Sequence, residues 1–346
     1  MKELLKKLSL AFGPSGCEDA VRELIYEEIK DYIDKDSATV DALGNLIVHM
    51  GGNGPKMMIC AHMDEVGFMV TGIGENGSLK FGTVGGIDPI SLGAKRVISE
   101  SGVRGAISAK PIHLLTKEER EAGPKIKNMT IDIGADTREE AEELTFIGDY
   151  FTFDSGYEEY GNGYIKCKAL DDRLGCAIMC QLIKDIKNGA IDLKYDTYFA
   201  FTTREEIGYS GAFSASARIN PDYAIVIESK AVADIYGVEG SKKVSVLGDG
   251  VIISYADRGT IYDRTLISHI KRIADENEIK NQVNLYISGG NDSANIQKNA
   301  CGARVSTLSC ASRYIHSQSD VIHETDFFAA YEVVKKVLNE NPPTKE

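Results

Sequence analysis

The chain has 346 residues, of which 43% are hydrophobic and 26% are charged, as is usual for a globular protein. The 39 lysines and arginines against 52 aspartates and glutamates give a formal net charge of −13. That charge argues against a general nucleic-acid binder or a protein that docks on anionic membranes. No apolar run is long enough to span a bilayer, and the length predicts more than one domain.

The first residues and the cysteines bear on where the protein works. Residues 1–16 read MKELLKKLSLAFGPSG, which predicts an amphipathic helix with charges throughout rather than a signal peptide. Seven cysteines are an odd number and no CxxC pair occurs, so neither a disulfide framework nor a cysteine-ligated zinc site is expected. We therefore predict a reduced, cytoplasmic protein in which most thiols are buried.

The first candidate site follows a buried strand. Ser15 and Glu18 have the spacing of a capping box, which predicts the start of a helix. Strands are expected at 46–48 and 57–61, and the second of these runs directly into His62 and Asp64. A histidine at a strand end is usually structural, but a carboxylate two residues later can orient a metal-bound imidazole.

The character of the sequence changes between residues 67 and 163, where glycines become frequent and apolar runs become short. Capping boxes at Thr116 and Thr137 predict two short helices. We predict a small β-rich domain, 67–163, inserted between the two halves of an α/β domain, 1–66 and 164–346. Short strands are expected within it at 68–70, 79–81, 97–98, 103–107 and 145–147.

After the insert, strands again lead into polar side chains. A strand at 166–170 precedes Asp171 and Asp172, which open a helix with apolar residues at four-residue spacing. Aromatic and β-branched alternation in the first half of 195–212 predicts a core strand that delivers Glu205 and Glu206. Each pair also has an ordinary explanation, because aspartate is a favoured N-cap and most Glu-Glu pairs are solvated.

The remaining elements add two more candidates. A buried strand at 221–228 ends in Glu228, and a strand at 303–308 leads to His316. We also expect helices at 263–276 and from Thr325 onward, and a strand at 283–287.

These side chains should meet, because the ligand site of an open α/β sheet lies at the carboxyl ends of its strands. Two histidines with three or four carboxylates suit zinc, and also cobalt or manganese. One shared carboxylate allows two metals about 3.5–4 Å apart, and the remaining glutamate is free to act as a general base. The order H-x-D, D-D, E-E, E, H therefore predicts a two-metal hydrolase.

With these motifs in place, the sequence resembles the dinuclear metal aminopeptidases of the tetrahedral, dodecameric type. These are the glutamyl and deblocking aminopeptidases, often labelled cellulases or endoglucanases. The resemblance implies a zinc-peptidase-like mixed sheet flanked by helices, an inserted β-rich dimerisation domain, and dimers that assemble into a hollow dodecamer. It covers nearly the whole chain and rests on AHMDEVG (61–67), GAISAKPIHLL (105–115), IDIGADTREEA (131–141), KALDDRLG (168–175), TTREEIGYSGA (202–212) and SRYIHS (312–317).

The resemblance also implies a metal-ligand set, position by position. His62 would ligate the first metal. Asp171 would bridge the two metals, with a cis peptide bond to Asp172. Glu206 and His316 would ligate the second metal.

Four further residues complete the implied site. Glu205 would be the general base, and Asp64 would support the first histidine ligand. Glu228 stands where the family usually has aspartate, and we expect it to remain a metal ligand through its longer arm. Asp292, in the Gly-Asn-Asp-Ser loop at 290–293, is the candidate substrate contact.

We therefore predict a metal-dependent aminopeptidase that acts on peptides with two divalent ions per chain, Zn²⁺ first and Co²⁺ or Mn²⁺ as alternatives. Metal-activated water would attack the peptide carbonyl after Glu205 takes its proton. An amidase or deacylase with the same site, and a catalytically inactive scaffold, remain alternatives. A cellulase is disfavoured, because Glu205 and Glu206 are adjacent at one strand end and do not flank a sugar.

Overall fold

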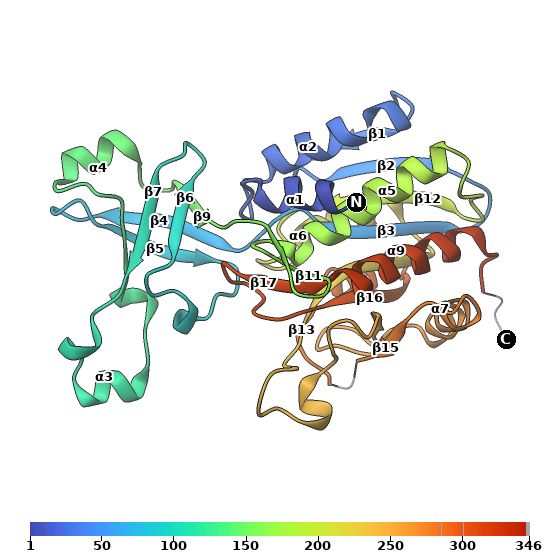
Figure 1. Cartoon of the computed structure of the whole chain (residues 1–346). Helices are drawn as coiled ribbons and strands as arrows, with labels where there is room; N and C mark the ends of the chain where they lie inside the picture. The colour runs from blue at the N-terminus through green and yellow to red at the C-terminus, as the bar shows by residue number, and fades with distance from the viewer. Residues whose placement is uncertain (285, 300, 344–346) are drawn as a thin grey trace.

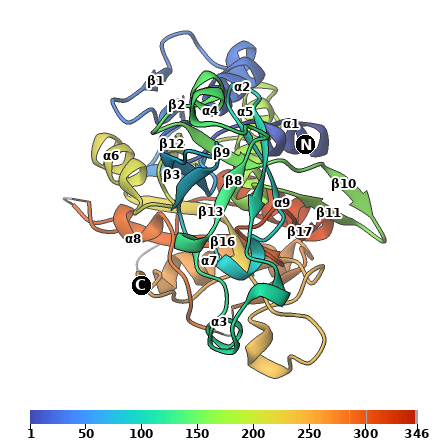
Figure 2. The same ribbon diagram turned by 90° about the vertical axis from the view of Figure 1, so that its left-hand side faces the viewer.

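The computed structural model describes residues 1–284, 286–299 and 301–343. The chain forms a helix-covered mixed sheet and a closed barrel, which lie side by side in Figure 1, with the barrel on the left. Figure 2 looks onto the barrel, with the sheet behind it.

The large sheet has the strand order β1-β2-β12-β3-β13-β16-β14-β15. Its four central strands, which are β12, β3, β13 and β16, run parallel to one another. Parallel strands covered on both faces read as continuous apolar runs, which explains sequences such as Met-Met-Ile-Cys-Ala in β3. The predicted mixed α/β sheet is confirmed. Its strands are β1 Ala38–Val40, β2 Leu46–Gly51, β3 Lys56–His62, β12 Asp196–Thr202, β13 Tyr223–Ala231, β14 Val251–Ile253, β15 Asn281–Val283 and β16 Arg304–Ser312.

Helices α5 and α6 cover the centre of this sheet. The connection from β3 to β12 passes through α5, and the connection from β12 back across β3 to β13 passes through α6. Because these crossovers run in opposite directions and are right-handed by rule, the two helices lie on opposite faces. The helices of this part are α1 Lys2–Leu10, α2 Asp19–Ile29, α5 Leu170–Lys187, α6 Ser210–Ile219, α7 Arg264–Glu276, α8 Ser293–Ile296 and α9 Glu324–Asn339.

The barrel has its own core. Phe68 packs edge-to-face on Phe81 and Phe153, with ring centroids 5.3 and 5.2 Å away. Helices α3 (Lys117–Ala122) and α4 (Arg138–Leu144) project from it (Figure 1). Its strands, in the order β4-β5-β8-β7-β6-β9, are β4 Gly67–Ile73, β5 Leu79–Val84, β6 Arg96–Ser99, β7 Arg104–Ser108, β8 Thr130–Asp132 and β9 Tyr150–Phe153.

A small antiparallel sheet carries the chain from the barrel back to the helix-covered sheet. It consists of β10 (Glu158–Tyr160), β11 (Tyr164–Cys167) and β17 (Asp320–His323). The last barrel strand therefore ends at Phe153, and β10 pairs with β11 rather than with a barrel strand. Among the helices of the described residues, none has the length and apolar composition that a bilayer-spanning helix needs.

The local helix predictions have mixed outcomes. The capping box at Thr116 is confirmed, with both reciprocal hydrogen bonds to Glu119 present. The box at Ser15 is wrong, because α2 begins after Glu18 and the Ser15 hydroxyl donates to Asp64 Oδ2 at 2.6 Å instead. In a cap the hydroxyl would accept from a backbone N–H, whereas here it donates to a buried carboxylate, and such a charge-assisted hydrogen bond is the stronger of the two.

Two strand predictions also need revision. The predicted strand at 145–147 is wrong. There the chain turns from α4 into β9, with Phe146 and Ile147 exposed and Gly148 at a φ of 98°. The predicted strand at 283–287 includes residue 285, which lies outside the described residues, and the structure has β15 at 281–283. The expectation that no disulfide forms is confirmed, since all seven cysteines are free thiols.

Candidate metal centre

The predicted polar residues meet at the carboxyl edge of the large sheet. His62 is the last residue of β3 and is paired in register with Thr202, the last residue of β12. Glu228 lies near the end of the neighbouring β13, and His316 follows β16. The parallel order of these strands places their ends side by side, as expected for a ligand site of this fold.

Asp171 lies between the two histidines. Its Oδ1 is 3.3 Å from His62 Nε2, and its Oδ2 is 3.1 Å from His316 Nε2. Each imidazole has a further carboxylate beside it, with Glu228 Oε1 at 3.7 Å from His62 Nε2 and Glu206 Oε1 at 3.2 Å from His316 Nε2. The result is two half-sites that share one carboxylate. The peptide bond between Asp171 and Asp172 is cis.

The donor set fits divalent metal ions. Ligand atoms of His62, Asp171 and Glu206 lie within 4.8 Å of one another, as do those of His62, Asp172 and Glu228. Asp171 Oδ1 and Glu228 Oε2 are buried and have no hydrogen-bond partner among the described residues. Buried carboxylate oxygens without partners are costly, and a cation is the group that satisfies them. Imidazole and carboxylate donors suit zinc, cobalt and manganese.

The electrostatics of the cluster also favour a bound cation. Burial and the neighbouring Asp171 raise the pKa of Glu228 to about 8. Burial also raises the pKa of Glu205 well above its usual range, although His62 opposes the shift. Burial disfavours the charged form of His316, but Glu206 and Asp171 outweigh it and raise the pKa to about 12. The carboxylates therefore repel one another, and positive charge placed among them relieves that repulsion.

Asp64 holds the turn that carries the two glutamates. Its Oδ1 accepts a hydrogen bond from the backbone N–H of Glu205 at 3.0 Å, and its Oδ2 accepts one from Glu206 at 3.2 Å. Burial raises the pKa of Asp64, but His62, Ser15 and the N–H of Glu205 outweigh it and lower the pKa overall. The ionised carboxylate thus fixes the direction in which both glutamates enter the site.

Two other side chains hold the same turn. Asn45 Oδ1 accepts from the backbone N–H of Thr203 at 2.9 Å, and Glu18 Oε1 accepts from Arg204 at 3.1 Å. Arg204 has a φ of 58°, a left-handed conformation that persists in a non-glycine residue only where its surroundings enforce it. With Asp64, four consecutive backbone N–H groups, 203–206, donate to side chains from other parts of the chain.

The barrel also reaches the site. The carbonyl of Gly86, which follows β5, accepts a hydrogen bond from His316 Nδ1 at 2.7 Å. This bond leaves Nε2 free to face Asp171 and Glu206. At Gly85, with a φ of 85°, a Cβ would lie 2.8 Å from Val66 and 3.2 Å from the Glu206 Cβ. Sequence reasoning missed the contact between Gly86 and His316, for which the only signal was the Gly-Gly pair at 85–86.

A cavity of about 450 Å³ opens over the cluster. Besides the glutamates and histidines, it is lined by Tyr209, Lys230 and the loop 288–291. Asp292 is 1% exposed and lies behind this wall, where its Oδ2 accepts from the Thr202 hydroxyl at 2.6 Å. That Asp292 contacts substrate stays a prediction. Asp172, which sequence reasoning did not name as a ligand, lies close enough to join His62 and Glu228.

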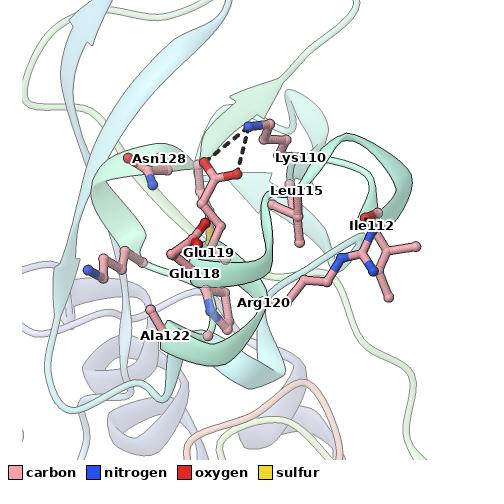
Figure 3. A pocket seen from close by; sticks show the side chains of 13 residues that line it. Lys110, Ile112, Leu115, Glu118, Glu119, Arg120, Ala122 and Asn128 are labelled. Atoms are coloured by element: carbon pink, nitrogen blue, oxygen red, sulfur yellow. Dashed lines mark hydrogen bonds and ion pairs between the residues drawn. The ribbon is translucent and has the colours of Figure 1, made fainter.

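A larger cavity, of about 630 Å³, lies around α3, in the segment that connects β7 and β8 of the barrel (Figure 3). Lys110 spans it to pair with Glu119, and Ile112 and Leu115 contribute apolar walls. None of the clustered metal-ligand candidates found among the described residues lines it. The chemistry therefore belongs to the smaller cavity at the sheet edge.

Comparison with known proteins identifies the family. Residues 44–333 match the family of M42 glutamyl aminopeptidases. This chain belongs to the M42 family. The lysyl aminopeptidase of Pyrococcus furiosus is 30% identical to it over 355 residues, covering 99% of this chain and 97% of the relative. This M42 protein is thus an aminopeptidase, and the predicted enzyme class is confirmed.

Two solved structures share the whole fold. The TET aminopeptidase of the marine sediment archaeon Thaumarchaeota archaeon SCGC AB-539-E09 is 32% identical, with a TM-score of 0.94 and coverage of 98% of this chain and 96% of that chain. The TET1 peptidase of Pyrococcus horikoshii is 34% identical, with a TM-score of 0.86 and coverage of 98% and 99%. Both resemble the M42 chain across the sheet and the barrel.

Proposed function

We propose that this M42 chain removes N-terminal residues from peptides with two divalent metal ions, most simply Zn²⁺, with Co²⁺ or Mn²⁺ as alternatives. The observation that carries the proposal is the position of Asp171 between two imidazoles, each with a second carboxylate beside it. Two-metal hydrolases use this kind of shared carboxylate to hold their ions about 3.5–4 Å apart.

The ligands divide into two groups in this proposal. His62, Asp171 and Glu228 would hold one ion, and His316, Asp171 and Glu206 would hold the other. The Glu228 carboxylate reaches to within 3.7 Å of His62 Nε2, which supports its role despite the aspartate usual at this position. The helix-covered sheet is then the catalytic domain, and the barrel is the inserted domain that positions His316 through Gly86.

Glu205 is the proposed general base. Two bound ions would lower the pKa of a water molecule between them and polarise the peptide carbonyl. Glu205 lines the cavity and is 8% exposed, and its carboxylate is free to take the proton of that water and return it to the leaving amine. Asp64 fixes the backbone of Glu205 for this transfer.

The test is Glu205→Gln, which removes the proton acceptor and keeps the shape of the side chain. We expect the variant to retain the metal content of the wild type, and kcat on aminoacyl-anilides to fall roughly 10²- to 10⁴-fold. Full activity would remove Glu205 from the mechanism. Metal loss together with activity loss would make it a ligand instead. An amidase or deacylase would retain metals but hydrolyse only acylated substrates in a parallel panel.

We also propose that the barrel mediates a homo-oligomeric assembly of dimers into a dodecamer. The TET1 peptidase of Pyrococcus horikoshii can assemble into a tetrahedron or a large octahedral shell. On the barrel of this chain, Ile90, Ile112 and Leu114 are 77%, 72% and 58% exposed. Such apolar side chains on one small domain are typical of a subunit interface, and closed symmetry would bury them.

A further inference from the structure

The backbone of Tyr209 is held in an unfavourable conformation at the edge of the active-site cavity. Its φ is 61°, a left-handed value that is rare for an aromatic residue. Its N–H donates to the carbonyls of Arg204 and Glu205, each at 3.1 Å, and its carbonyl accepts from Asn295 Nδ2 at 3.2 Å. Such conformations persist where the surroundings enforce them, and they cluster at active sites. The fold therefore fixes the position of Tyr209 relative to Glu205.

The phenol of Tyr209 has no hydrogen-bond partner in the described part of the chain. Its side chain lines the cavity together with Glu205 and Glu228. All hydrogen bonds that Tyr209 makes within the described residues come from its backbone. Because tyrosine hydroxyls away from bulk water usually find a partner, this hydroxyl is a donor that remains available to a bound molecule.

The loop 288–291 fixes where the hydroxyl lies. An ideal Cβ on Gly290 would lie 2.9 Å from the Tyr209 hydroxyl, so the phenol packs directly on this glycine. The loop is held in turn, because Asn291 Nδ2 donates to the Tyr262 hydroxyl at 3.1 Å. The oxygen of the phenol thus stays at the cavity wall, and its proton is free to turn toward a ligand.

Two carboxylates of the site act on this hydroxyl. After burial, the charge of Glu205 is the main cause that raises the pKa of Tyr209 to about 12, and the charge of Glu228 adds to it. The hydroxyl therefore lies on the side of the cavity that holds the proposed base, and it keeps its proton at neutral pH. It is available there as a hydrogen-bond donor.

We infer that the Tyr209 hydroxyl donates a hydrogen bond to the scissile carbonyl oxygen as this oxygen becomes an oxyanion, and that Tyr209 is thus a further catalytic residue. The inference rests on the proposed function. When the oxygen of water bonds to the carbonyl carbon, Glu205 takes a water proton and the π electrons of the carbonyl move onto its oxygen. When the C–N bond breaks, these electrons re-form the carbonyl and the proton passes to the leaving amine. The hydrogen bond is strongest between these two steps.

The other side chains of the cavity explain why such a donor is useful. Glu205, Glu206 and Glu228 line the cavity, and ionised carboxylates only accept hydrogen bonds. The ammonium of Lys230 in the same wall already donates to the carbonyl of Ser288 at 2.6 Å. A neutral phenol stabilises negative charge that develops among these carboxylates, as tyrosine side chains do in oxyanion holes.

Tyr209→Phe removes the hydroxyl and keeps the ring. On aminoacyl p-nitroanilides, kcat should fall roughly 10- to 100-fold, as a hydrogen bond to a charged oxygen implies, while KM changes less than about twofold. Equal losses in kcat and kcat/KM mark an interaction made only in the transition state. The metal content should match that of the wild type.

Tyr195→Phe is the matched control for the loss of a phenolic hydroxyl. The Tyr195 hydroxyl also lacks a partner among the described residues. It lies just before β12, at the opposite end of this strand from the site. We expect Tyr195→Phe to keep the wild-type kcat and KM.

A binding measurement separates this role from simple packing. The phosphonate analogue of leucine carries a tetrahedral anion where a substrate has its carbonyl, whereas isopentylamine has the same side chain and amino group without it. In calorimetric titrations of the metal-loaded proteins, Tyr209→Phe should bind the phosphonate more weakly by about the factor lost in kcat, and should bind isopentylamine as the wild type does. Should the variant not fold, wild-type protein with meta-fluorotyrosine at position 209 replaces it, and its fluorine NMR signal should shift with the phosphonate and not with isopentylamine.

Wild-type kinetics in Tyr209→Phe would overturn the inference, and so would a loss that appears in KM alone. A fluorine signal that does not respond to the phosphonate would do the same. Each of these results leaves the aminopeptidase proposal intact, because the wild-type enzyme still cleaves the anilides. If metal-loaded wild-type enzyme cleaves none of them, the proposed function itself fails, and the inference fails with it.

Discussion

Replacing Asp64 with asparagine should weaken metal binding far more than it weakens the fold. The Oδ1 atom of Asp64 accepts from Glu205 N–H and lies 3.4 Å from His62 Nδ1, and Oδ2 accepts from Glu206 N–H and the Ser15 hydroxyl. An asparagine can keep only one of these oxygens. Its best orientation places the amide nitrogen at the Oδ2 position, where the Ser15 hydroxyl can reverse its bond and accept.

In that orientation the N–H of Glu206 loses its acceptor. A buried donor left without a partner costs about 1–3 kcal/mol, which is the expected loss in the free energy of unfolding. The loss of the negative charge beside His62, and the shift of Glu206, add an effect on the metals. Replacing a group that orients a metal ligand typically costs 10- to 100-fold in metal affinity, and we expect a loss of that order.

Asp326→Asn is the matched control, because Asp326 also accepts from two backbone N–H groups, those of Gly248 and Gly250, away from the cluster. Urea unfolding of chelator-treated protein measures stability, and competition with a chromophoric chelator measures metal affinity. Both variants should lose similar stability, and only Asp64→Asn should lose metal affinity. Equal metal affinity in the two variants would refute the argument that Asp64 acts on the metal site.

Two further predictions concern packing and assembly. A Cβ on Gly175 would lie 2.6 Å from Asp172 Oδ2 and 2.7 Å from Ala61 Cβ, so Gly175→Ala should lower the free energy of unfolding by about 1–3 kcal/mol despite the better helix propensity of alanine. Thermal unfolding checks this, with Gly156→Ala as the control because a Cβ there meets open space. An unchanged melting temperature of Gly175→Ala would contradict the prediction. Light scattering should find a wild-type particle with the mass of a dodecamer, and Ile112→Asp should lower the mass of that particle. A monomeric wild type would exclude the proposed assembly.

The sequence predicted most of the framework of the site because most of it lies at strand ends. Strand prediction needs only local apolar runs or alternation, and parallel strands bring their ends to one edge whatever the details of their connections. That is why His62, Glu206 and His316, which are far apart in the sequence, could be grouped from the sequence alone. Asp171 differs, because the strand predicted at 166–170 ends at Cys167 and Asp171 lies in the first turn of α5. The mutual distances of these residues depend on packing, which no local pattern encodes.

The missed features depend on contacts between distant parts of the chain. Ser15 has the spacing of a helix cap, but the carboxylate of Asp64 competes for its hydroxyl, and this partner is 49 residues away. The bond between Gly86 and His316 joins the barrel to the sheet across 230 residues. Residues 145–147 have strand-like composition, yet the geometry of the connection into β9 decides their conformation.

Metal stoichiometry of protein purified without chelator tests the central claim most directly, because the two half-sites around Asp171 predict two ions per chain. Mass spectrometry should find about two divalent ions per chain. Their removal should abolish the release of N-terminal residues, and adding Zn²⁺ or Co²⁺ should restore it. One ion per chain with full activity would contradict the two-metal site, and full activity after complete metal removal would contradict the account as a whole.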